Sequence, residues 1–467
     1  MKRRMVRFLL CLFFAGGVLA GETSSKPQAW VNEDETKVPA YTLPDVFLCE
    51  DGSTVATKQD WLKKRRPELL RLLTREMYGE VPAILQTDHP DFIKYEVMEE
   101  DRDALGGKAI RRQVAIHFYA PGEEARHNGS ATGPVRKSDI FAAGASSRRC
   151  LTVNVLLYLP KKADHPVPCF LGMNFNGNQT VCDDTHIFMS EYFEKGQVPE
   201  KKRRGMAKDR WCVEKILDAG YGLVTCYYEN IVPDRVDGLD SGIFSLYGPA
   251  PDQRKDSDWG AIAAWAWALS RIMDYIEQDP ELDTTRVIVM GHSRLGKTAL
   301  WAGACDPRFA AVISNNSGCG GAALSRREFG ERVVRINDSF PHWFARKFHT
   351  YGEDVNRLPF DQHALLALVA PRPLYVASAE QDRWADPKGE YLATLEAAKV
   401  YRLFGIAAFG DAPQPELPAV NMPLGEGVRY HIRTGKHDVT AFDWDQYLRF
   451  ADQNLKEKTP RYGGIDN

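Results

Sequence analysis

One serine in this sequence stands where a strand pattern gives way to a helix pattern. The segment VIVMGHSRLGKTAL (287–300) begins with β-branched residues and ends with helix formers, which places Ser293 in a sharp turn. A serine in such a turn is typical of the nucleophile elbow, G-x-S-x-G, which presents a reactive hydroxyl. Here the second glycine, Gly296, comes one position late, and Arg294 directly follows the serine. Ser293 is therefore a candidate nucleophile in an atypical turn.

Candidates for an acid and a base follow the serine in chain order. A serine hydroxyl becomes a good nucleophile when an imidazole takes its proton and a carboxylate orients that imidazole. Asp382 follows a strand pattern at 373–378, and His437 follows one at 428–433. Because the carboxyl ends of parallel strands share one edge of a sheet, we expect Ser293, Asp382 and His437 to meet there. The order serine, acid, histidine is that of the α/β-hydrolases.

Other residues compete for the acid and base roles. Glu380 and Asp386 lie near Asp382 and are alternative acids. The structural alternative for Asp382 is an ion pair with a basic group such as Arg383. His437 lies in a glycine-containing turn, so its alternative is a surface histidine. Three other histidines are candidates for the base: His342, His363 and His431. The last of these alternates within a strand pattern and is expected to be structural.

The same turn also matches a phosphate-binding pattern. Residues 291–298, GHSRLGKT, fit G-x-x-x-x-G-K-[ST], in which backbone N–H groups and the lysine bind phosphates. That interpretation leaves Asp382 and His437 without a role. The turn also lies deep in the chain, in a protein whose predicted export leads to a compartment poor in nucleotides. The hydrolase interpretation is therefore favoured.

Strand and helix patterns alternate from about residue 166 onward, which indicates a mostly parallel sheet with helices on both faces. The expected strands are 168–175, 221–227, 286–290, 309–314, 373–378 and 428–433. The expected helices are 259–277, 296–304 and 388–403. Before them, alternating segments between 95 and 160 predict antiparallel strands with a loop at 128–149, and 58–78 predicts a helix ended by Gly79. The predicted fold class is the α/β-hydrolase fold, a three-layer α/β/α sandwich.

Residues 1–20 have the basic start, apolar stretch and small-residue cleavage site of a secretory signal peptide. We expect 21–467 to form a single catalytic domain with an N-terminal extension. Its long insertions, around 176–210 and 229–256, are typical of functional rims. No later segment is long and apolar enough to span a membrane. The sequence thus predicts a secreted or periplasmic protein.

The composition limits which classes of partner and cofactor are expected. Without the signal peptide the formal charge changes from −3 to −7, which argues against nucleic acid as a partner. The basic run 201–204 is interpreted as a solvated loop. Eight cysteines remain, and their pairing cannot be read from the sequence. No spacing of cysteines or histidines suggests a metal site, and no cofactor is expected.

Several motifs resemble one known family. Residues 291–297, GHSRLGK, are similar to the G-C-S-R-x-G-K motif of glucuronoyl esterases, carbohydrate esterase family 15. These enzymes cleave the ester that joins 4-O-methyl-glucuronic acid on xylan to lignin alcohols. Further segments resemble the bacterial branch of the family, in the same order along the chain: 76–79, 174–178, 259–275, 320–323, 340–344, 361–363 and 370–373. The resemblance extends from about residue 60 to 455.

The resemblance gives the residues after the serine a role. It implies that Ser293 is the nucleophile and that the Arg294 side chain stabilises the oxyanion beside the backbone N–H. A fixed cation at the developing negative charge does the work of an oxyanion donor, ~2.7–4 kcal/mol. The residues alone leave Arg294 equally open as an ion-pair partner or a surface charge. Lys297 is implied to bind sugar hydroxyls, with a solvated helix lysine as the alternative.

The acid is where this chain departs from many family members. They carry a glutamate at the position of Asn316, and an amide cannot supply the negative charge that stabilises an imidazolium. Resemblance to bacterial members that take the acid from a later strand end points to Asp382. His292 and Asp438 stand where fungal members have cysteines beside the serine and the histidine, so that disulfide is missing.

Two further residues resemble substrate contacts of the family. Trp384, two residues past the predicted acid, could stack on a sugar ring, and an interior tryptophan is its alternative. Glu331 resembles a substrate-contacting glutamate, and an exposed helix carboxylate is its alternative.

Taken together, the sequence predicts a serine esterase of the 4-O-methyl-glucuronoyl methylesterase type. Its expected substrate is a glucuronoxylan or lignin–carbohydrate ester, and the protein is expected to be a monomer. An acetylxylan or feruloyl esterase is the alternative within enzymes. A non-catalytic glycan-binding relative, which has lost its acid at Asn316, is the alternative outside them.

Overall fold

Six stretches of the chain are described by the computed structural model: 31–86, 92–121, 150–163, 166–189, 199–410 and 415–455. The predicted signal peptide and the expected loop at 128–149 lie outside the described residues, so both remain predictions.

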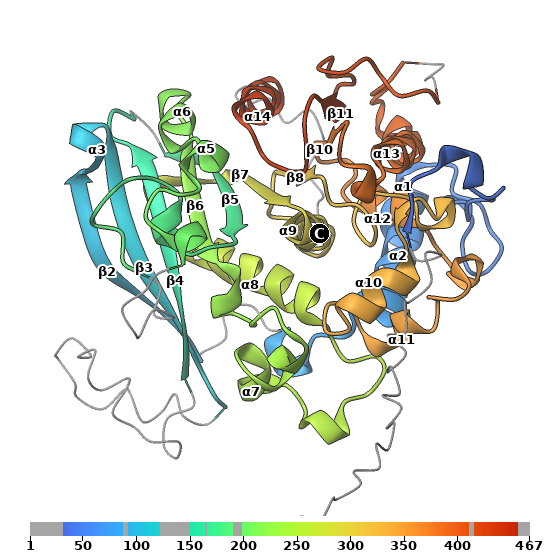
Figure 1. Cartoon of the computed structure of the whole chain (residues 1–467), viewed down its shortest axis with the longest axis horizontal. Coiled ribbons are helices and arrows are strands. Elements are labelled where there is room, and N and C mark those ends of the chain that lie inside the picture. The colour runs from blue at the N-terminus through green and yellow to red at the C-terminus, as the bar shows by residue number, and fades with distance from the viewer. Residues whose placement is uncertain are drawn as a thin grey trace, which may run out of the picture.

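One large sheet forms the centre of the molecule. Within the described residues it has nine strands in the order β11-β10-β8-β7-β5-β6-β4-β3-β2 (Figure 1). Their bounds are β2 (Ile93–Asp103), β3 (Ala109–Tyr119), β4 (Cys150–Pro160), β5 (Val167–Asn174), β6 (Gly222–Tyr227), β7 (Leu282–His292), β8 (Ala311–Asn315), β10 (Leu374–Ala379) and β11 (Val428–Arg433). Strands β5 to β8, β10 and β11 pair in parallel, whereas β2, β3 and β4 pair antiparallel and β4 also runs antiparallel to β6. The predicted mostly parallel sheet with antiparallel N-terminal strands is confirmed.

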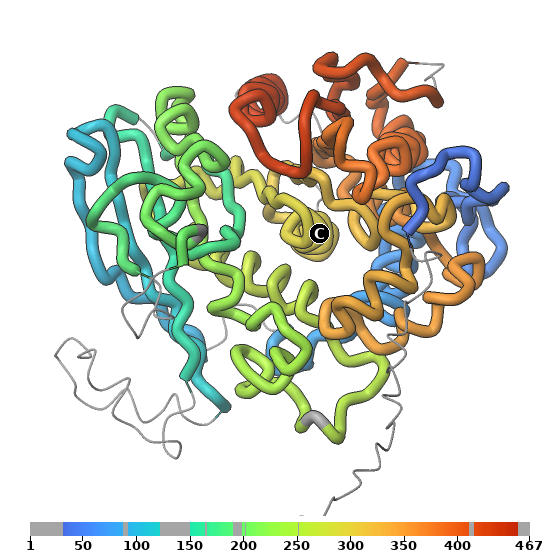
Figure 2. The backbone as a smooth tube through the Cα atoms, in the orientation of Figure 1, coloured from blue at the N-terminus to red at the C-terminus, as the bar shows by residue number. Residues whose placement is uncertain are grey.

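Helices cover both faces of this sheet. The helices in the described residues are α1 (Lys58–Asp60), α2 (Arg66–Leu73), α3 (Ala104–Gly107), α5 (Lys208–Trp211), α6 (Val213–Asp218), α7 (Ile243–Tyr247), α8 (Ala261–Ile276), α9 (Arg294–Cys305), α10 (Val333–Ser339), α11 (Arg346–His349), α12 (Gln362–Ala367), α13 (Pro387–Tyr401) and α14 (Ala441–Leu455). Residues of α8, α9, α12 and α13 share one apolar core, and residues of α6 and α14 share a second. Figures 1 and 2 show α6 and α14 on the side of the sheet opposite α8.

Alternation along the strands supplies the apolar surface of both cores. Val289 belongs to the core of α8 and α9, whereas its neighbours Ile288 and Met290 belong to the core of α6 and α14. Successive side chains of a strand point to opposite faces, so a strand covered on both sides is apolar throughout. This arrangement confirms the predicted three-layer α/β/α sandwich.

The predicted helix at 58–78 is continuous, with two π-helical segments, Trp61–Arg65 and Thr74–Tyr78, adjoining α1 and α2. It ends at Gly79, whose φ is +85°. A Cβ on Gly79 would lie 2.4 Å from the Cα of Trp259, so only glycine allows the chain to pass so close to the start of α8.

The described residues also form a second sheet of two strands. Its strands, β1 (Val31–Asn32) and β9 (Gly330–Glu331), pair antiparallel. Strands of two residues carry no periodic pattern, and the sequence did not predict them. No helix in the described residues is both long and apolar enough to cross a bilayer.

Candidate active site

Ser293 lies between β7 and α9, at the carboxyl edge of the parallel strands. Its φ of 58° and ψ of −129° fall in a region that residues with a Cβ rarely adopt. The turn is tight, since a Cβ on Gly291 would lie 1.9 Å from the carbonyl oxygen of Leu295. A strained strand-to-helix turn of this kind exposes the hydroxyl of its central serine. The strand, turn and helix predicted around Ser293 are therefore confirmed.

The late second glycine has a packing explanation. A Cβ on Gly296 would lie 3.0 Å from the Cβ of Ser317, so this glycine lets α9 pack closely on the chain that follows β8. Leu295 occupies the usual position of that glycine and is buried in the core. The shift by one residue places glycine at the point of closest approach.

The predicted acid and base are in contact. His437 Nδ1 and Asp382 Oδ2 are 2.6 Å apart. Because a carboxylate accepts hydrogen bonds, this contact assigns the ring proton to Nδ1 and leaves Nε2 as the acceptor. Asn316 Nδ2 also donates to Asp382 Oδ2, at 2.7 Å. A backbone hydrogen bond of 3.0 Å from Gln381 N to Gly435 O joins the loops that carry the two residues.

The alternatives for the acid do not contact His437: Glu380 is exposed, and Asp386 is engaged elsewhere. Asp386 accepts from Arg327 Nε at 2.9 Å. Arg383 lies 3.9 Å from the carboxylate of Glu33 instead of pairing with the residue before it. Of the three carboxylates considered, Asp382 is the one bonded to the histidine ring.

His437 lies next to the nucleophile turn. The centroids of its ring and of the His292 ring are 4.4 Å apart, and His292 directly precedes Ser293. Within the described residues, the Ser293 hydroxyl and the His437 ring form no hydrogen bond. In structures without substrate the hydrogen bond between such groups is often longer or absent. His437 thus lies beside the turn that carries Ser293, and direct contact of its ring with the hydroxyl belongs to the proposal below.

The alternative histidines make other contacts. His342 Nε2 lies 2.8 Å from Asp234 Oδ1, and His363 Nε2 lies 3.0 Å from the carbonyl oxygen of Pro44. His431 is fully buried in β11, as expected for a structural residue.

Arg294 begins α9 and is held by a carboxylate and by aromatic rings. Its Nη1 forms an ion pair with Asp234 Oδ2, so the ion pair left open by the sequence is present. The guanidinium carbon lies 4.8 Å from the ring centroid of Trp343, 5.5 Å from that of Phe340 and 5.9 Å from that of Phe175. Its buried Nε has no hydrogen-bond partner among the described residues. A donor therefore remains on this immobilised cation.

Asp234 is a site residue that the sequence did not single out. It also accepts from His342 Nε2 at 2.8 Å, Trp343 Nε1 at 2.7 Å and the Tyr228 hydroxyl at 2.8 Å. Burial by itself would raise the pKa of Asp234, but the hydrogen bond from His342 and the charge of Arg294 outweigh it, and the pKa lies below its usual range. Its place in the long loop after β6 was the one sequence signal.

The three predicted substrate contacts lie in different environments. Lys297 is buried and donates from Nζ to the Ser317 carbonyl at 2.6 Å, so the solvated-lysine alternative is wrong. Glu331 is buried in β9 and is not an exposed helix carboxylate. Burial raises the pKa of Glu331, and the charges of Lys297 and Arg294 oppose that shift. Trp384 is 39% exposed, so it is not an interior tryptophan.

Glu390 is a second buried carboxyl group that the sequence did not single out, and it lies close enough to Asp382 to be affected by its charge. Glu390 is fully buried on α13 and accepts from Gly318 N at 2.9 Å, Ser317 Oγ at 3.3 Å and Ser378 Oγ. Burial, reinforced by the charge of Asp382, raises the pKa of Glu390 to about 8. Glu390 thus links the chain after β8 to β10.

Glu390→Gln is expected to change the pH dependence of stability by removing one titrating group. The unfolded chain releases this proton near pH 4.5, whereas the folded chain keeps it to about pH 8. Between these values the unfolded state binds fewer protons, so the free energy of unfolding falls as pH rises, by up to ~4 kcal/mol. Urea unfolding across that range should show the stability of the wild type falling relative to that of Glu390→Gln as pH rises. Glu416→Gln, at an exposed carboxylate, is the control and should keep the wild-type slope. Equal slopes in all three proteins would contradict the assignment.

No group of His, Cys, Asp and Glu side chains in the described stretches is arranged to hold a metal ion. The eight cysteines of those stretches are free. Asp438, where fungal members have a cysteine, instead accepts from Arg210 Nε at 2.7 Å.

Comparison with known proteins identifies the family of this chain. The family model described as glucuronyl esterase, fungi, matches residues 217–405. Carbohydrate esterase MZ0003, from an unknown prokaryotic organism, is 44% identical over 435 residues, which covers 91% of this chain and 92% of that protein. The 4-O-methyl-glucuronoyl methylesterase of Schizophyllum commune is 36% identical over 377 residues and covers 78% of this chain and 74% of its own length.

Comparison with solved structures leads to the same family. The glucuronoyl esterase from Solibacter usitatus is 45% identical, with a TM-score of 0.77, over 90% of this chain and 100% of that chain. A promiscuous CE15 esterase from a marine bacterial metagenome is 43% identical, with a TM-score of 0.77, over 91% and 100% of the two chains. This chain therefore belongs to the glucuronoyl esterases, carbohydrate esterase family 15, which are carboxylic ester hydrolases of the α/β-hydrolase fold.

Proposed function

We propose that this protein is a serine esterase that hydrolyses the ester between (4-O-methyl-)glucuronic acid of xylan and lignin alcohols. The observation that carries the proposal is the 2.6 Å contact of Asp382 with His437, beside the strained turn of Ser293. An oriented imidazole beside a partly accessible serine is the arrangement that activates a hydroxyl. Relatives named glucuronoyl esterase and 4-O-methyl-glucuronoyl methylesterase support the substrate class.

The reaction needs two acyl-transfer steps. His437 takes the proton of Ser293 as the hydroxyl oxygen attacks the uronate carbonyl, and Asp382 stabilises the imidazolium. The imidazolium then protonates the alcohol as the C–O bond breaks, which leaves a glucuronoyl ester on Ser293. Water, deprotonated by His437, attacks this ester; as the bond between the acyl carbon and the Ser293 oxygen breaks, the imidazolium returns the proton to Ser293 and glucuronate is released. Ester and water are consumed, acid and alcohol are formed, and the reaction as written uses no cofactor.

Arg294 supplies positive charge where the intermediate becomes negative. As the first residue of α9, it offers a backbone N–H from the helix end that lacks intrahelical acceptors. Its guanidinium, fixed by Asp234 and stacked over Trp343, needs little rearrangement when the oxyanion forms. Preorganised donors of this kind are typically worth ~2.7–4 kcal/mol each.

The sugar would contact the residues beside Arg294. Lys297 and Glu331 are buried groups of opposite charge that interact electrostatically, and both can hydrogen-bond hydroxyl groups. Trp384 offers an exposed ring on which a sugar can stack.

The direct test compares ester classes on purified protein. Benzyl glucuronate and the methyl ester of glucuronate are expected to be cleaved, and Ser293→Ala should cleave neither. Faster turnover of acetylated xylan or feruloyl esters would replace the proposed substrate class. Glycan binding without cleavage of any ester would favour a non-catalytic role.

Asp234→Asn is expected to lower kcat by about 100-fold, because Arg294 loses the carboxylate that positions it. Asp237→Asn, at an exposed position in the same loop, is the matched control and should stay within about twofold of wild type. Steady-state kinetics at a temperature where both variants are folded provides the measurement. Equal kcat values for the two variants would contradict the role of Asp234.

We also propose that the protein acts outside the cytoplasm, secreted or periplasmic, as a monomer. Cell fractionation and N-terminal sequencing test the export, and light scattering of the purified protein tests the oligomeric state.

A further inference from the structure

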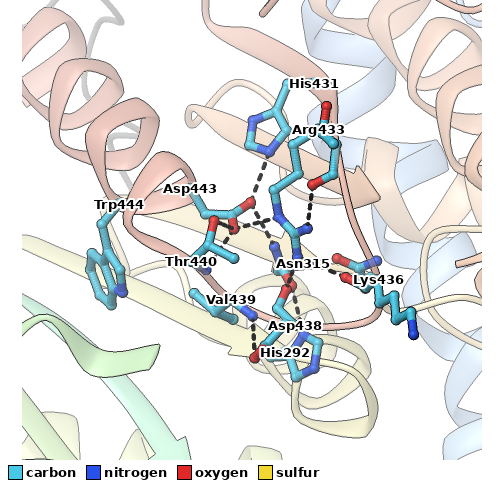
Figure 3. Close-up of polar contacts among 12 residues, drawn as sticks. His292, Asn315, His431, Arg433, Lys436, Asp438, Val439, Thr440, Asp443 and Trp444 are labelled. Atoms are coloured by element: carbon cyan, nitrogen blue, oxygen red, sulfur yellow. Dashed lines mark hydrogen bonds and ion pairs between the residues drawn. The ribbon is translucent and has the colours of Figure 1, made fainter. Parts of the chain in front are cut away.

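A buried polar network lies behind the loop that carries His437, and its centre is Asp443. This carboxylate, in the first turn of α14, is fully buried. It accepts from His431 Nε2 at 2.9 Å, from Arg433 Nε at 2.7 Å and from Thr440 N at 2.7 Å (Figure 3). Burial alone would raise the pKa of Asp443, but the hydrogen bond from His431 and the charge of Arg433 lower it below its usual value. Asp443 is thus a carboxylate paired with a buried guanidinium.

The guanidinium of Arg433 holds the backbone on both sides of His437. Besides Asp443, it donates from Nη1 to Thr434 O at 3.0 Å and from Nη2 to Lys436 O at 3.0 Å and to Asp438 O. The loop therefore wraps around one planar donor group. Gly435 makes this possible, because its φ is +108° and a Cβ there would lie 3.2 Å from Arg433 Nη1.

The same carboxylate also anchors the nucleophile side. Asn315, at the end of β8, donates from Nδ2 to Asp443 Oδ1 at 3.3 Å, and its Oδ1 lies 2.6 Å from His292 Nδ1 (Figure 3). The ring of His292 packs on that of His437. Burial keeps the pKa of His292 well below its usual value, so this neighbour adds no charge that would oppose an imidazolium.

We propose that Arg433 and Asp443 are positioning residues that hold the His437 loop at the Ser293 turn. This inference rests on the proposed function. Buried ion pairs add little net stability compared with apolar residues of similar size, so fixing a geometry is the better explanation for this pair. A displacement of about 1 Å at a reacting group can cost 100-fold in rate, which sets the size of the expected effect.

Two conservative variants separate positioning from stability. Arg433→Lys keeps a cation beside Asp443, but its ammonium has three N–H donors for the four oxygens that the planar guanidinium bonds. Asp443→Asn removes the charge and keeps the shape. We expect both variants to lower kcat on benzyl glucuronate by about 10- to 100-fold, with KM within about twofold of wild type.

Asp279→Asn is the matched control. Asp279 is likewise a buried carboxylate paired with a buried arginine, Arg112, and it precedes β7 at the opposite end from Ser293. This variant should lose thermal stability but keep its kcat. If Arg433→Lys and Asp443→Asn change kcat no more than Asp279→Asn does, the positioning role is overturned.

Hydrogen exchange tests the anchoring without a substrate. Amide protection of residues 434–438 should fall in Arg433→Lys and stay at the wild-type level in Asp279→Asn. Unchanged protection in Arg433→Lys would overturn the inference even if the wild type cleaved a different ester. A wild type that cleaves no glucuronate ester, together with lost protection in Arg433→Lys, would contradict the proposed substrate and leave the anchoring supported.

Discussion

Ser293→Ala is expected to lower kcat on a glucuronate ester by about five to six orders of magnitude. The reason is that the variant lacks the oxygen that attacks the carbonyl, while Arg294 and the sugar contacts remain in place. Circular dichroism and thermal unfolding should show a folded protein, because alanine keeps the Cβ and the backbone of the turn. Binding of the ester, measured by calorimetry, should persist.

Ser293→Gly is the matched variant for this position. It should be as inactive as Ser293→Ala yet more stable than it by about 1 kcal/mol, because glycine adopts a φ of 58° without steric cost. Substantial turnover in either variant would contradict the assignment of the nucleophile. Equal stability of the two would contradict the strain attributed to the turn.

Asp382→Asn is expected to lower kcat by about 10⁴-fold with little change in KM. The amide cannot stabilise the imidazolium of His437, and it can hold the ring in the wrong tautomer by donating to Nδ1. Asn316, which donates to the wild-type carboxylate at 2.7 Å, would also lose a charged acceptor.

Two neighbouring carboxylates serve as controls for Asp382. Glu380→Gln should leave kcat within about threefold of wild type, and Asp386→Asn should mainly lower stability because it breaks a buried pair with Arg327. Equal, small effects of the three substitutions on kcat would remove Asp382 from the role of catalytic acid partner.

The positions of the proposed triad could be predicted because each of its residues follows a strand, and the ends of these strands can be predicted from the sequence. Each strand of the parallel sheet was visible as a short apolar run or, at 428–433, as an alternation of apolar and polar residues. The residues that follow 286–290, 373–378 and 428–433 include Ser293, Asp382 and His437. In a parallel sheet these ends lie at one edge, so the topology brings together residues that are far apart in sequence.

The supporting residues could not be predicted in this way. Asp234 contacts Arg294 across 60 positions from a loop without a periodic pattern, and Asp443 contacts the end of β8 across 128. The sequence predicted the helix that carries Glu390, but its pattern did not show that this carboxyl group is fully buried. Such contacts depend on side-chain direction in the folded chain, which spacing along the sequence does not specify.

The sequence left open whether Lys297 and Glu331 are exposed, and their burial in the structure decides both cases. Lys297 lies one turn into α9, where the sequence is compatible with either an exposed or a buried lysine. In the structure it is buried and donates to the Ser317 carbonyl. Glu331 lies in a two-residue strand that the sequence did not predict, so its helix alternative was wrong.

The central claim is that the Ser293 oxygen is the atom that attacks the ester. It is tested most directly by inactivating the enzyme with an organophosphonate in the presence and absence of benzyl glucuronate, then locating the adduct by peptide mass spectrometry. We predict an adduct on Ser293 that forms in step with the loss of esterase activity and is slowed by the ester. Full modification of Ser293 with activity unchanged, or full inactivation with the adduct on another residue, would contradict the account.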